Sequence, residues 1–292
     1  MEADTYDALV IGGGPAGLQA ALTLGRMHRT VLLVDSGRYR NGTVAHSHNF
    51  VTHDGRAPDE LRRLAREDLA RYATVELREA TVESVEETED GFVARTSDGT
   101  VEARTLILAT GMTDELPDVP GLAEAWGREV ANCPFCHGHE FADRPIGLVG
   151  EGPSIAELEA ILVPIGSEVI TFGHHDLVKV ERLEDGLLVQ RRAGPAVELA
   201  GLFLHPSTSQ AAPFAEQLGL DMLPSGCVRV DALGRTSRPR VFAAGDLAHV
   251  EELPVPMPSI LGAAAAGQAA GASAVRFLAN PDSEVESHPF TD

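Results

Sequence analysis

The sequence contains a buried-strand pattern at residues 6–11, YDALVI, that runs directly into a glycine turn at residues 12–17, GGGPAG. We predict an alanine- and leucine-rich helix from this turn to about Met27, followed by a strand over residues 30–34 that ends in Asp35. Strand, turn, helix and strand make a βαβ unit, and the right-handed crossover rule makes its two strands parallel neighbours. This stretch therefore predicts an α/β fold built on a parallel sheet.

The glycine turn has the spacing of a dinucleotide site. Gly12, Gly14 and Gly17 give the pattern G-x-G-x-x-G between a strand and a helix. The first glycine permits the tight turn, the second lets the backbone approach a pyrophosphate, and the third allows close packing of helix on strand. A plain structural turn is the alternative interpretation. Asp35, placed where a ribose hydroxyl needs an acceptor, favours the dinucleotide.

Two later strands are also predicted to end in glycine. Residues 105–109 are followed by Thr110-Gly111, and residues 241–244 by Gly245-Asp246. Ligands gather at the carboxyl edge of a parallel sheet, so these turns are candidates for the same site. Between residues 82 and 103 two Asp-Gly turn signals predict a three-stranded meander that covers one face of the sheet. A further helix is predicted from Pro58 to Tyr72.

A second βαβ unit is predicted in the middle of the chain. Its strands are residues 146–149 and 168–172, its helix is residues 154–165, and its turn is Gly150-Glu151-Gly152. The Pro- and acid-rich stretch 114–121 is typical of a domain linker. We therefore predict an α/β protein with two Rossmann-like, three-layer ββα domains: residues 1–115 and 241–292 form the first, which a central domain of residues 116–240 interrupts.

Composition excludes several classes of partner. The 292-residue chain has 23 basic and 44 acidic residues, a net charge of −21, which repels nucleic acid and anionic membranes. No stretch reaches the ~20 apolar residues needed to span a bilayer, and no basic region precedes the first apolar run. We therefore expect a cytoplasmic protein with no nucleic-acid or membrane partner. Cys227 stands alone and is expected to be a small buried residue.

The most specific feature is the C-x-x-C pair within residues 132–139, NCPFCHGH. Its spacing holds two sulfurs close enough for a disulfide, and a nearby imidazole or helix N-terminus can lower a thiol pKa. Cys133 and Cys136 are therefore predicted to be redox-active. A c-type haem attachment, a zinc site with His137 and His139, and two buried structural cysteines are the alternatives. We expect no metal.

The three glycine-ended strands, in this order, resemble the FAD-binding domain of the thioredoxin-reductase branch of the pyridine-nucleotide-disulfide oxidoreductases. The resemblance covers nearly the whole chain and implies FAD as cofactor and a homodimer. It implies that Asp246 bonds a hydroxyl of the flavin chain, and that the helix from Ser259 to Leu278 points its N-terminus at the flavin. The implied FAD-binding residues are Gly12, Gly14, Pro15, Ala16, Gly17, Asp35, Ser36, Asn41, His48, Asn49, Val82, Thr110, Gly111, Gly245, Asp246, Ser259 and Ile260.

The resemblance also assigns roles within the redox pair. It implies that Cys136 faces the flavin and that Cys133 meets the substrate. In thioredoxin reductases an acid that follows the motif is thought to donate a proton, and here His137 takes that position. We predict that His137 is a general base, because its pKa lies near neutrality. A hydrogen-bonded, structural histidine is the alternative interpretation.

The chain departs from a reductase at the second glycine turn. A family NADPH site has a small residue where this chain has Ile155, and Glu151 puts a carboxylate where a pyrophosphate should lie. Residues 173–176, GHHD, contain no arginine to bind a 2′-phosphate. The second turn is therefore predicted to have lost its nucleotide.

The form C-x-F-C-H-G, with Arg40-Asn41 and the segment His46-Ser47-His48-Asn49, is similar to dithiol oxidases that close the disulfides of gliotoxin-like and holomycin-like metabolites. This resemblance implies a FAD-dependent enzyme that oxidises a small-molecule dithiol, with O2 as electron acceptor. One alternative is an NAD(P)H- or ferredoxin-dependent disulfide reductase that serves a thioredoxin-like protein. A flavin redox sensor is the other.

Overall fold

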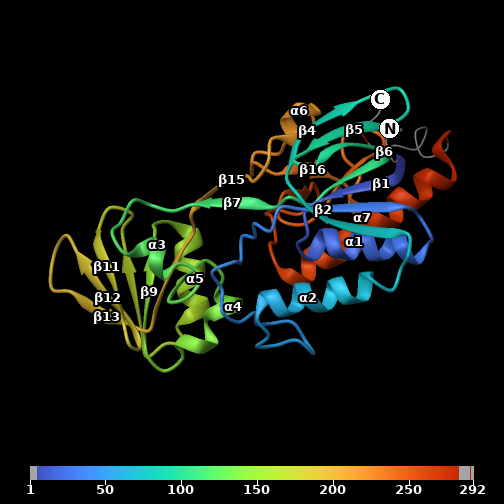
Figure 1. The fold of residues 1–292 in the computed structure, drawn as a ribbon. Coiled ribbons are helices and arrows are strands. Elements are labelled where there is room, and N and C mark those ends of the chain that lie inside the picture. Colours follow the sequence, from blue (N-terminus) through green and yellow to red (C-terminus); the bar gives the residue numbers. More distant parts are fainter. Residues whose placement is uncertain (1–4, 283–289, 291–292) are drawn as a thin grey trace. The chain divides into compact units, whose positions relative to one another are not determined.

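The computed structural model describes residues 5–282 and 290, and the contacts divide the chain into two units (Figure 1). Unit 1 contains the chain up to Arg40, Asp59–Thr113, and the chain from Ser209 onward. Unit 2 contains Asn41–Pro58 and Asp114–Thr208. Residues 1–4, 283–289 and 291–292, which the predicted first domain includes, lie outside the described residues.

Unit 1 is built on a seven-stranded sheet in which β3-β2-β1-β6-β5-β4 are consecutive neighbours and β17 also pairs with β6. Strands β3, β2, β1, β6 and β17 run parallel. The strands are β1 (Thr5–Ile11), β2 (Val31–Asp35), β3 (Val75–Glu79), β4 (Val82–Glu87), β5 (Phe92–Thr96), β6 (Gly99–Leu108) and β17 (Val241–Ala243). The first βαβ unit has the predicted parallel pairing, with Leu9 opposite Leu32.

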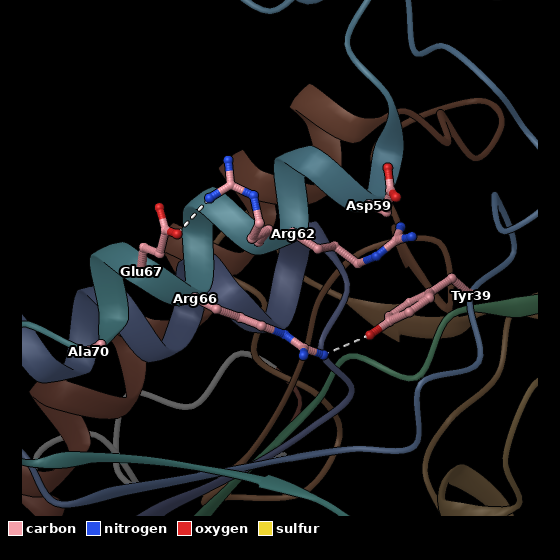
Figure 2. A pocket seen from close by; sticks show the side chains of 7 residues that line it. Tyr39, Asp59, Arg62, Arg66, Glu67 and Ala70 are labelled. Atoms are coloured by element: carbon pink, nitrogen blue, oxygen red, sulfur yellow. Dashed lines mark hydrogen bonds and ion pairs between the residues drawn. The ribbon is translucent and has the colours of Figure 1, made fainter.

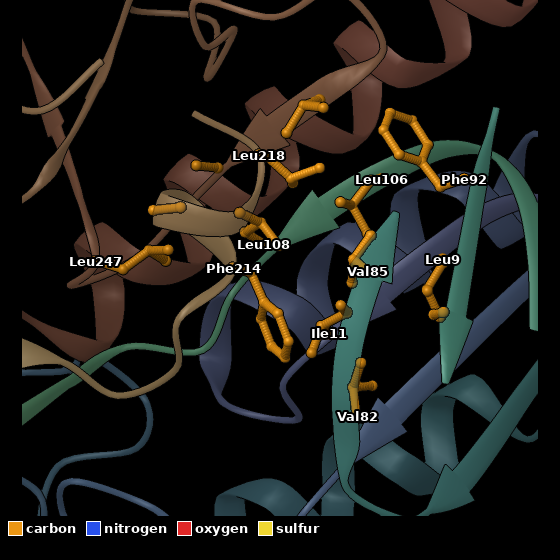
Figure 3. Close-up of a cluster of buried hydrophobic side chains, with 14 of the residues drawn as sticks. Leu9, Ile11, Val82, Val85, Phe92, Leu106, Leu108, Phe214, Leu218 and Leu247 are labelled. Carbon is orange, nitrogen blue, oxygen red and sulfur yellow. The ribbon is translucent and has the colours of Figure 1, made fainter. Parts of the chain in front are cut away.

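Two apolar layers cover the sheet of unit 1. On one face, helices α1 (Pro15–Arg26) and α7 (Ile260–Ala279) contribute Leu18 and Ala270 to a core that contains Val10 and Ile107. Helix α2 (Pro58–Leu69) adds Leu69 to this core. The other face carries a second core, shown in Figure 3.

The predicted meander pairs with the sheet through β6 and covers one of its faces, because Val85 and Phe92 lie in the second core with Leu9. Strands β4 and β5 pair antiparallel, and β5 pairs antiparallel with the first half of β6. The predicted third meander strand and the predicted strand over residues 105–109 are one continuous strand, β6. Its first half alternates exposed and buried residues, and Thr105–Leu108 is fully buried where β1 and β17 flank it.

The unit boundary after the central region lies at Thr208, whereas the sequence placed it after Arg240. Residues 209–240 contain α6 (Phe214–Gln217) and β16 (Val228–Val230), and β16 pairs with β18 (Ala248–Val250). Phe214 and Val228 are buried in the second core of unit 1, which holds this segment there. Two of the four passages of the chain between the units lie within β7 (Met112–Glu115) and β15 (Ser207–Gln210), which pair with each other, and the other two lie at residues 40–41 and 58–59.

Unit 2 combines a parallel sheet in the order β10-β9-β14-β8 with an antiparallel sheet in the order β11-β12-β13. The central core packs Leu202 and Val149 of the first sheet with Val180 and Leu187 of the second. The parallel strands are β8 (Val130–Ala131), β9 (Pro145–Val149), β10 (Glu168–Phe172) and β14 (Gly201–Leu204), and the antiparallel ones are β11 (Leu177–Leu183), β12 (Gly186–Arg191) and β13 (Val197–Leu199).

Helices complete unit 2. Helix α5 (Pro153–Leu162) follows β9, as the second βαβ unit predicts, and buries Ile155 and Leu158 in a core with Leu148. The short helices α3 (Leu122–Ala125) and α4 (Pro134–His137) and a 3-10 turn (His139–Phe141) lie before β9. The predicted fold class, two Rossmann-like α/β domains, is confirmed. No helix in the described ranges is long and apolar enough to cross a bilayer.

Candidate functional site

The glycine turns of unit 1 meet at the carboxyl edge of its parallel sheet. Backbone bonds tie these turns together: Gly12 N donates to Val34 O at 2.8 Å, Ala109 N to Ile11 O at 2.9 Å, and Ala244 N to Leu108 O at 3.0 Å. The ends of β1, β2, β6 and β17 therefore lie side by side. This edge brings together the predicted site residues that follow these strands: Gly12, Gly14, Pro15, Ala16, Gly17, Asp35, Ser36, Thr110, Gly111, Gly245 and Asp246.

The first glycine turn is closed toward the sheet and open in front. A Cβ on Gly17 would overlap the carbonyl oxygen of Gly12, and a Cβ on Gly12 would overlap that of Ala109. A Cβ on Gly14 would have no heavy atom within 4 Å, although Gly14 is the N-cap of α1. Free space therefore lies beside the unpaired backbone N–H groups of a helix start. These residues fit the pyrophosphate of FAD.

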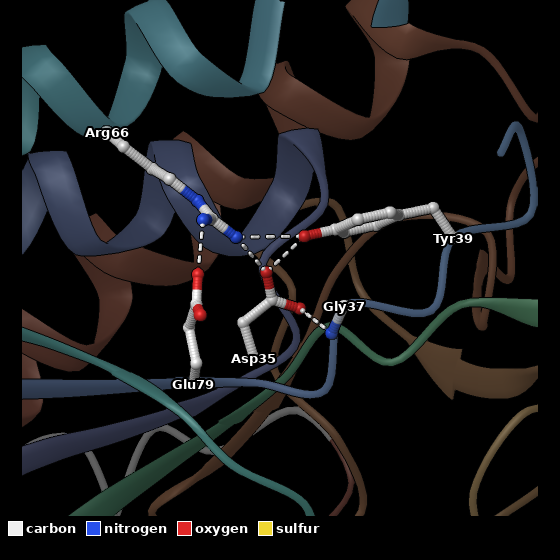
Figure 4. A network of polar contacts seen from close by, with 5 residues as sticks. All are labelled: Asp35, Gly37, Tyr39, Arg66 and Glu79. Atoms are coloured by element: carbon white, nitrogen blue, oxygen red, sulfur yellow. Dashed lines mark hydrogen bonds and ion pairs between the residues drawn. The ribbon is translucent and has the colours of Figure 1, made fainter. Parts of the chain in front are cut away.

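Asp35 ends β2 and is the buried member of a polar network (Figure 4). The residue is 2% exposed; its Oδ2 accepts from Arg66 Nη2 at 2.7 Å and from the Tyr39 hydroxyl, and its Oδ1 accepts from Gly37 N at 3.2 Å. Burial, and next the hydrogen bond to Asp35, raise the pKa of Tyr39 to about 12. The network fixes the carboxylate. An ionised carboxylate offers about four acceptor positions, so a ribose hydroxyl can still bond to it.

Arg66 and Tyr39 were not among the residues predicted for this site. Both line a cavity of about 460 Å³ beside α2, together with Arg62, whose Cζ lies 3.8 Å from the centroid of the Tyr39 ring (Figure 2). The available signal for Arg66 was helical spacing, since Arg62 and Arg66 are four residues apart and therefore lie on one face of α2. Nothing in the sequence indicates which acid that face meets.

The other predicted FAD contacts of unit 1 lie on separate elements. Arg40 Nη1 bonds Asp246 Oδ2 at 2.8 Å, so the acid that is expected to meet the flavin chain already has a cationic partner. Ser259 caps α7, where its hydroxyl accepts from Gly262 N at 2.9 Å, and Ile260 is the first residue of that helix. Val82 is buried in β4.

The redox pair lies in unit 2. Cys133 and Cys136 form a disulfide with their Cα atoms 5.3 Å apart. Pro134 starts the short helix α4 directly after Cys133, and Cys136 N donates to Cys133 O at 3.2 Å. Phe135, between the two cysteines, is 67% exposed. The short helical turn thus keeps the pair compact while the backbone between the sulfurs faces outward.

His137 follows the pair and is largely buried. Its ring stacks on Phe141 with centroids 6.3 Å apart, and Phe141 meets the fully buried Phe203 at 5.6 Å. Burial is the main reason that the pKa of His137 lies below its ordinary value, a nearby Glu140 raises it, and His48 lowers it further. A lowered pKa keeps the imidazole neutral, and able to accept a proton, at neutral pH.

The predicted site residues Asn41, His48 and Asn49 belong to unit 2, with the redox pair, and not to the unit with the glycine edge. His48 lies near two acids of this unit: its Nε2 is 3.5 Å from Glu140 Oε1, and its Nδ1 is 3.7 Å from Asp54 Oδ1. Glu140 was not among the predicted site residues. Its position three residues after His137, within a short helical segment, was the available signal.

The second glycine turn is as free of protein atoms at Gly152 as the first is at Gly14, but it differs in the side chains around it. Gly150 N bonds Phe172 O at 2.9 Å, as in the first turn, but the Cδ1 of Ile155 lies 2.7 Å from where a Gly150 Cβ would be. Glu151 Oε1 and Asp176 Oδ2 lie 3.0 and 3.1 Å from where a Cβ on Gly173 would be. Two carboxylates thus lie beside this turn at the end of β10, and Ile155 packs behind it. Like-charge repulsion would oppose a phosphate there.

Comparisons with known proteins agree with this architecture. A family model for pyridine nucleotide-disulphide oxidoreductases matches residues 6–187. Thioredoxin reductase sirT of Leptosphaeria maculans is 34% identical over 93% of this chain and 94% of its own. An oxidoreductase structure from Agrobacterium tumefaciens has a TM-score of 0.85 at 32% identity and covers 95% of this chain and 100% of that chain. The crystal structure of HlmI has a TM-score of 0.83 at 30% identity and covers 97% of this chain and 95% of that chain.

The family model covers more than half of the chain, and the two solved structures match nearly all of it. The open first turn, with its buried acid, fits the cofactor of such proteins. The chain therefore belongs to the pyridine nucleotide-disulphide oxidoreductase family and is a FAD-containing oxidoreductase.

Proposed function

We propose that this chain is a dithiol oxidase, which converts a small-molecule dithiol to a disulfide at Cys133 and Cys136 and passes the electrons through FAD to O2. The second glycine turn is the observation that carries the proposal. The carboxylates of Glu151 and Asp176 lie beside it, where a nicotinamide dinucleotide would need positive charge. Without that donor, electrons enter through the thiols of the substrate.

The proposed chemistry begins with thiol–disulfide exchange. A substrate thiolate attacks the Sγ of Cys133, the Cys133–Cys136 bond breaks, and Cys136 leaves as a thiolate. The second substrate thiolate then attacks the substrate sulfur of the mixed disulfide, which closes the product disulfide and releases the Cys133 thiolate. The substrate has lost two electrons and two protons, and the pair has gained the electrons. Bound FAD supplies the acceptor for this electron pair, and O2 is the proposed final acceptor, giving hydrogen peroxide.

His137 has the properties of the base that starts this exchange. It directly follows Cys136, and its lowered pKa keeps the imidazole neutral at pH 7. It can therefore take the proton of an incoming thiol. We expect His137→Gln to slow flavin reduction by a dithiol by about a hundred-fold or more, with the loss greatest near neutral pH, where an ordinary thiol is protonated.

A nicotinamide-dependent disulfide reductase is the second candidate. The names of the relatives favour it, since the sirT protein of Leptosphaeria maculans is called a thioredoxin reductase. This candidate needs a hydride donor that reaches FAD from a nucleotide site in unit 2. The carboxylates of Glu151 and Asp176 beside the second turn argue against such a site.

Anaerobic absorbance of the holoenzyme separates the two candidates. NADPH, NADH and then dithiothreitol are added in turn, and air is admitted last. The oxidase is expected to be bleached by the dithiol alone and to regain its flavin spectrum in air, with one peroxide per dithiol. Prompt bleaching by NADPH or NADH would reject the oxidase.

A Cys136→Ser variant provides the control for the route of the electrons. It should retain FAD, since Cys136 lies in unit 2 and the glycine edge lies in unit 1. We expect dithiothreitol to leave its flavin oxidised for at least a hundred times longer than in the wild type. Equal bleaching would mean that the dithiol reduces the flavin directly and that the pair has no part in the reaction.

A further inference from the structure

The carboxylate of Asp35 lies directly against the first glycine turn. A Cβ on Gly13 would overlap Asp35 Oδ2, so the carboxylate and the backbone of the turn are in contact. The free space at Gly14, the next residue, fits the pyrophosphate of FAD. In a dinucleotide site of this kind the acid that ends the second strand bonds a ribose hydroxyl, and in FAD this ribose carries adenine. We therefore expect the adenosine end of FAD at Asp35.

A cavity within unit 1 begins at the same carboxylate. Asp35 Oδ2 accepts hydrogen bonds from Arg66 Nη2 at 2.7 Å and from the Tyr39 hydroxyl, and both donors line the cavity of about 460 Å³ beside α2 (Figure 2). The wall of the cavity therefore starts one hydrogen bond away from the expected ribose acceptor. Adenine is bonded directly to that ribose, and a cavity of this volume lies within the range of small-ligand sites.

Two planar groups form a stack on the wall of this cavity. Arg62 Cζ lies 3.8 Å from the centroid of the Tyr39 ring. Arg66 Nη2 also donates to the Tyr39 hydroxyl at 3.0 Å, and this bond, together with the one to Asp35, holds the ring by its hydroxyl end (Figure 4). Guanidinium groups and aromatic rings both stack on the faces of nucleobases. The stack is formed in advance, so little ordering is needed when a base binds.

The charges around the stack suit a neutral base that carries an amino group. Arg63 is paired with Glu67 at 2.5 Å and Arg66 with Glu79 at 2.8 Å, so these charges offset one another. Asp59 also lines the cavity, and its exposed carboxylate can accept a hydrogen bond from an amino group. Adenine is uncharged at neutral pH and has one amino group. The lining therefore offers a surface for the face of adenine and an acceptor for its edge.

We propose that this cavity receives the adenine of FAD and that the stack of Arg62 on Tyr39 binds the face of the base. Asp35 accepts from the ribose hydroxyl beside it. Arg66 is a positioning residue, because it holds both Asp35 and the Tyr39 ring. The inference concerns the binding of the cofactor and goes beyond the proposed function, since it holds for an oxidase and for a reductase alike.

The first test is the affinity of the FAD-free chain for FAD, measured by flavin fluorescence. Arg62→Ala should weaken binding at least about ten-fold, as expected for the loss of one stacking contact to a base. Arg71→Ala removes an arginine of the same unit that does not line the cavity, and it should change nothing. Arg62→Lys should recover little, since an ammonium group has no planar face. Equal affinities of Arg62→Ala and the Arg71→Ala control, or full recovery in Arg62→Lys, would overturn the proposal.

The second test separates the ring of Tyr39 from its hydroxyl. Tyr39→Phe keeps the ring and should bind FAD about as tightly as the wild type, because Arg66 still holds Asp35. Tyr39→Leu loses the planar face and should bind FAD at least about ten-fold more weakly. If the two variants bind FAD equally well or equally poorly, Tyr39 provides no stacking face and the proposal fails.

AMP identifies the base as the group that is bound. Saturation-transfer NMR on the FAD-free chain should show transfer from the protein to the ring protons of AMP, and added FAD should remove it. The transfer should be lost in Arg62→Ala and kept in Arg71→Ala. Equal transfer in these two variants would mean that AMP is held by its phosphate. That result, no transfer in the wild type, or transfer that FAD does not displace would each place adenine outside this cavity.

Discussion

The two glycine turns of the molecule have the same frame, each with free space at the glycine that caps its helix, but they differ in the side chains around them. Each follows a buried parallel strand, β1 or β9, and each begins a helix, α1 or α5. Behind the first turn, Gly17 lets the helix touch the carbonyl of Gly12, and the front is open at Gly14. In the second turn Ile155 occupies the space behind Gly150, and Glu151 reaches toward Gly173.

The difference shows that a strand-turn-helix frame is not by itself a nucleotide site. The strand and the helix on either side of each turn contribute buried residues to the core of their unit. Both units therefore keep the strand-turn-helix arrangement, whether or not it binds a nucleotide. Binding depends on whether the turn leaves room and favourable charge in front of the helix. The same backbone arrangement can therefore hold a cofactor in unit 1 and serve as a scaffold for the redox pair in unit 2.

The largest expected effect breaks the first turn. Gly17→Ala places a Cβ inside the carbonyl of Gly12, which belongs to the backbone of the turn and has no room to move. We expect a loss of more than about 4 kcal/mol in the free energy of unfolding, or failure to fold, because overpacking here also displaces α1. Urea unfolding followed by circular dichroism measures this. Wild-type stability in Gly17→Ala would mean that the helix does not pack as closely as described.

Breaking the second turn should cost less. Ile155→Ala removes a buried side chain that fills the space beside Gly150, and we expect a loss of about 2–3 kcal/mol in the stability of unit 2. The bound FAD should be retained, since unit 1 is unchanged. Calorimetry with flavin absorbance measures both, and Ser154→Ala, an exposed neighbour on α5, is the control. A loss below 1 kcal/mol would show that Ile155 is not a structural replacement for a ligand.

The sequence predicts these two frames well, because local signals determine them. Strand β10 has the predicted bounds, and β1, β2, β9 and α1 agree to within a residue or two. Strand β3 was missed, since it is a partly exposed edge strand with only Val75 and Leu77 as apolar residues. The continuity of β6 was missed because its two halves have different burial, which depends on the neighbouring strands β5, β1 and β17.

The candidate site residues also differ in whether local sequence or distant contacts determine them. Glycine spacing and the C-x-x-C pair can be recognised from residues close together in the sequence. The partners of Asp35 and His48 lie 31 and 92 residues away, at Arg66 and Glu140, and no sequence pattern indicates these pairings. The assignment of residues 41–58 to unit 2 likewise depends on long-range contacts.

The Gly14→Ala substitution separates cofactor binding from folding. Its φ of −77° suits alanine, and the new Cβ would meet nothing in the protein, so we expect no change in the stability of the FAD-free chain. The methyl group would occupy the space that the pyrophosphate approaches, so the affinity for FAD should fall at least about ten-fold, or about 1.4 kcal/mol. Titration of the FAD-free chain with FAD, followed by flavin fluorescence, measures the affinity. Unchanged affinity would place the pyrophosphate elsewhere.

The smallest expected effect concerns the hydrogen bond from Tyr39 to Asp35, the acid that ends the first βαβ unit. The folded protein keeps Tyr39 protonated up to a pKa of about 12, whereas the unfolded chain loses this proton near its ordinary pKa of 10. The stabilisation is therefore complete below pH 10 and is lost as the pH rises toward 12. Tyr39→Phe should cost about 1 kcal/mol at neutral pH, through its bond to Asp35, and should flatten the fall in stability between pH 10 and 12. Urea unfolding at a series of pH values tests this, with Tyr72→Phe, also in unit 1, as the control. If both variants keep the wild-type slope, the Tyr39 proton is not coupled to folding, and Arg66 alone holds Asp35 in the orientation that the first turn requires.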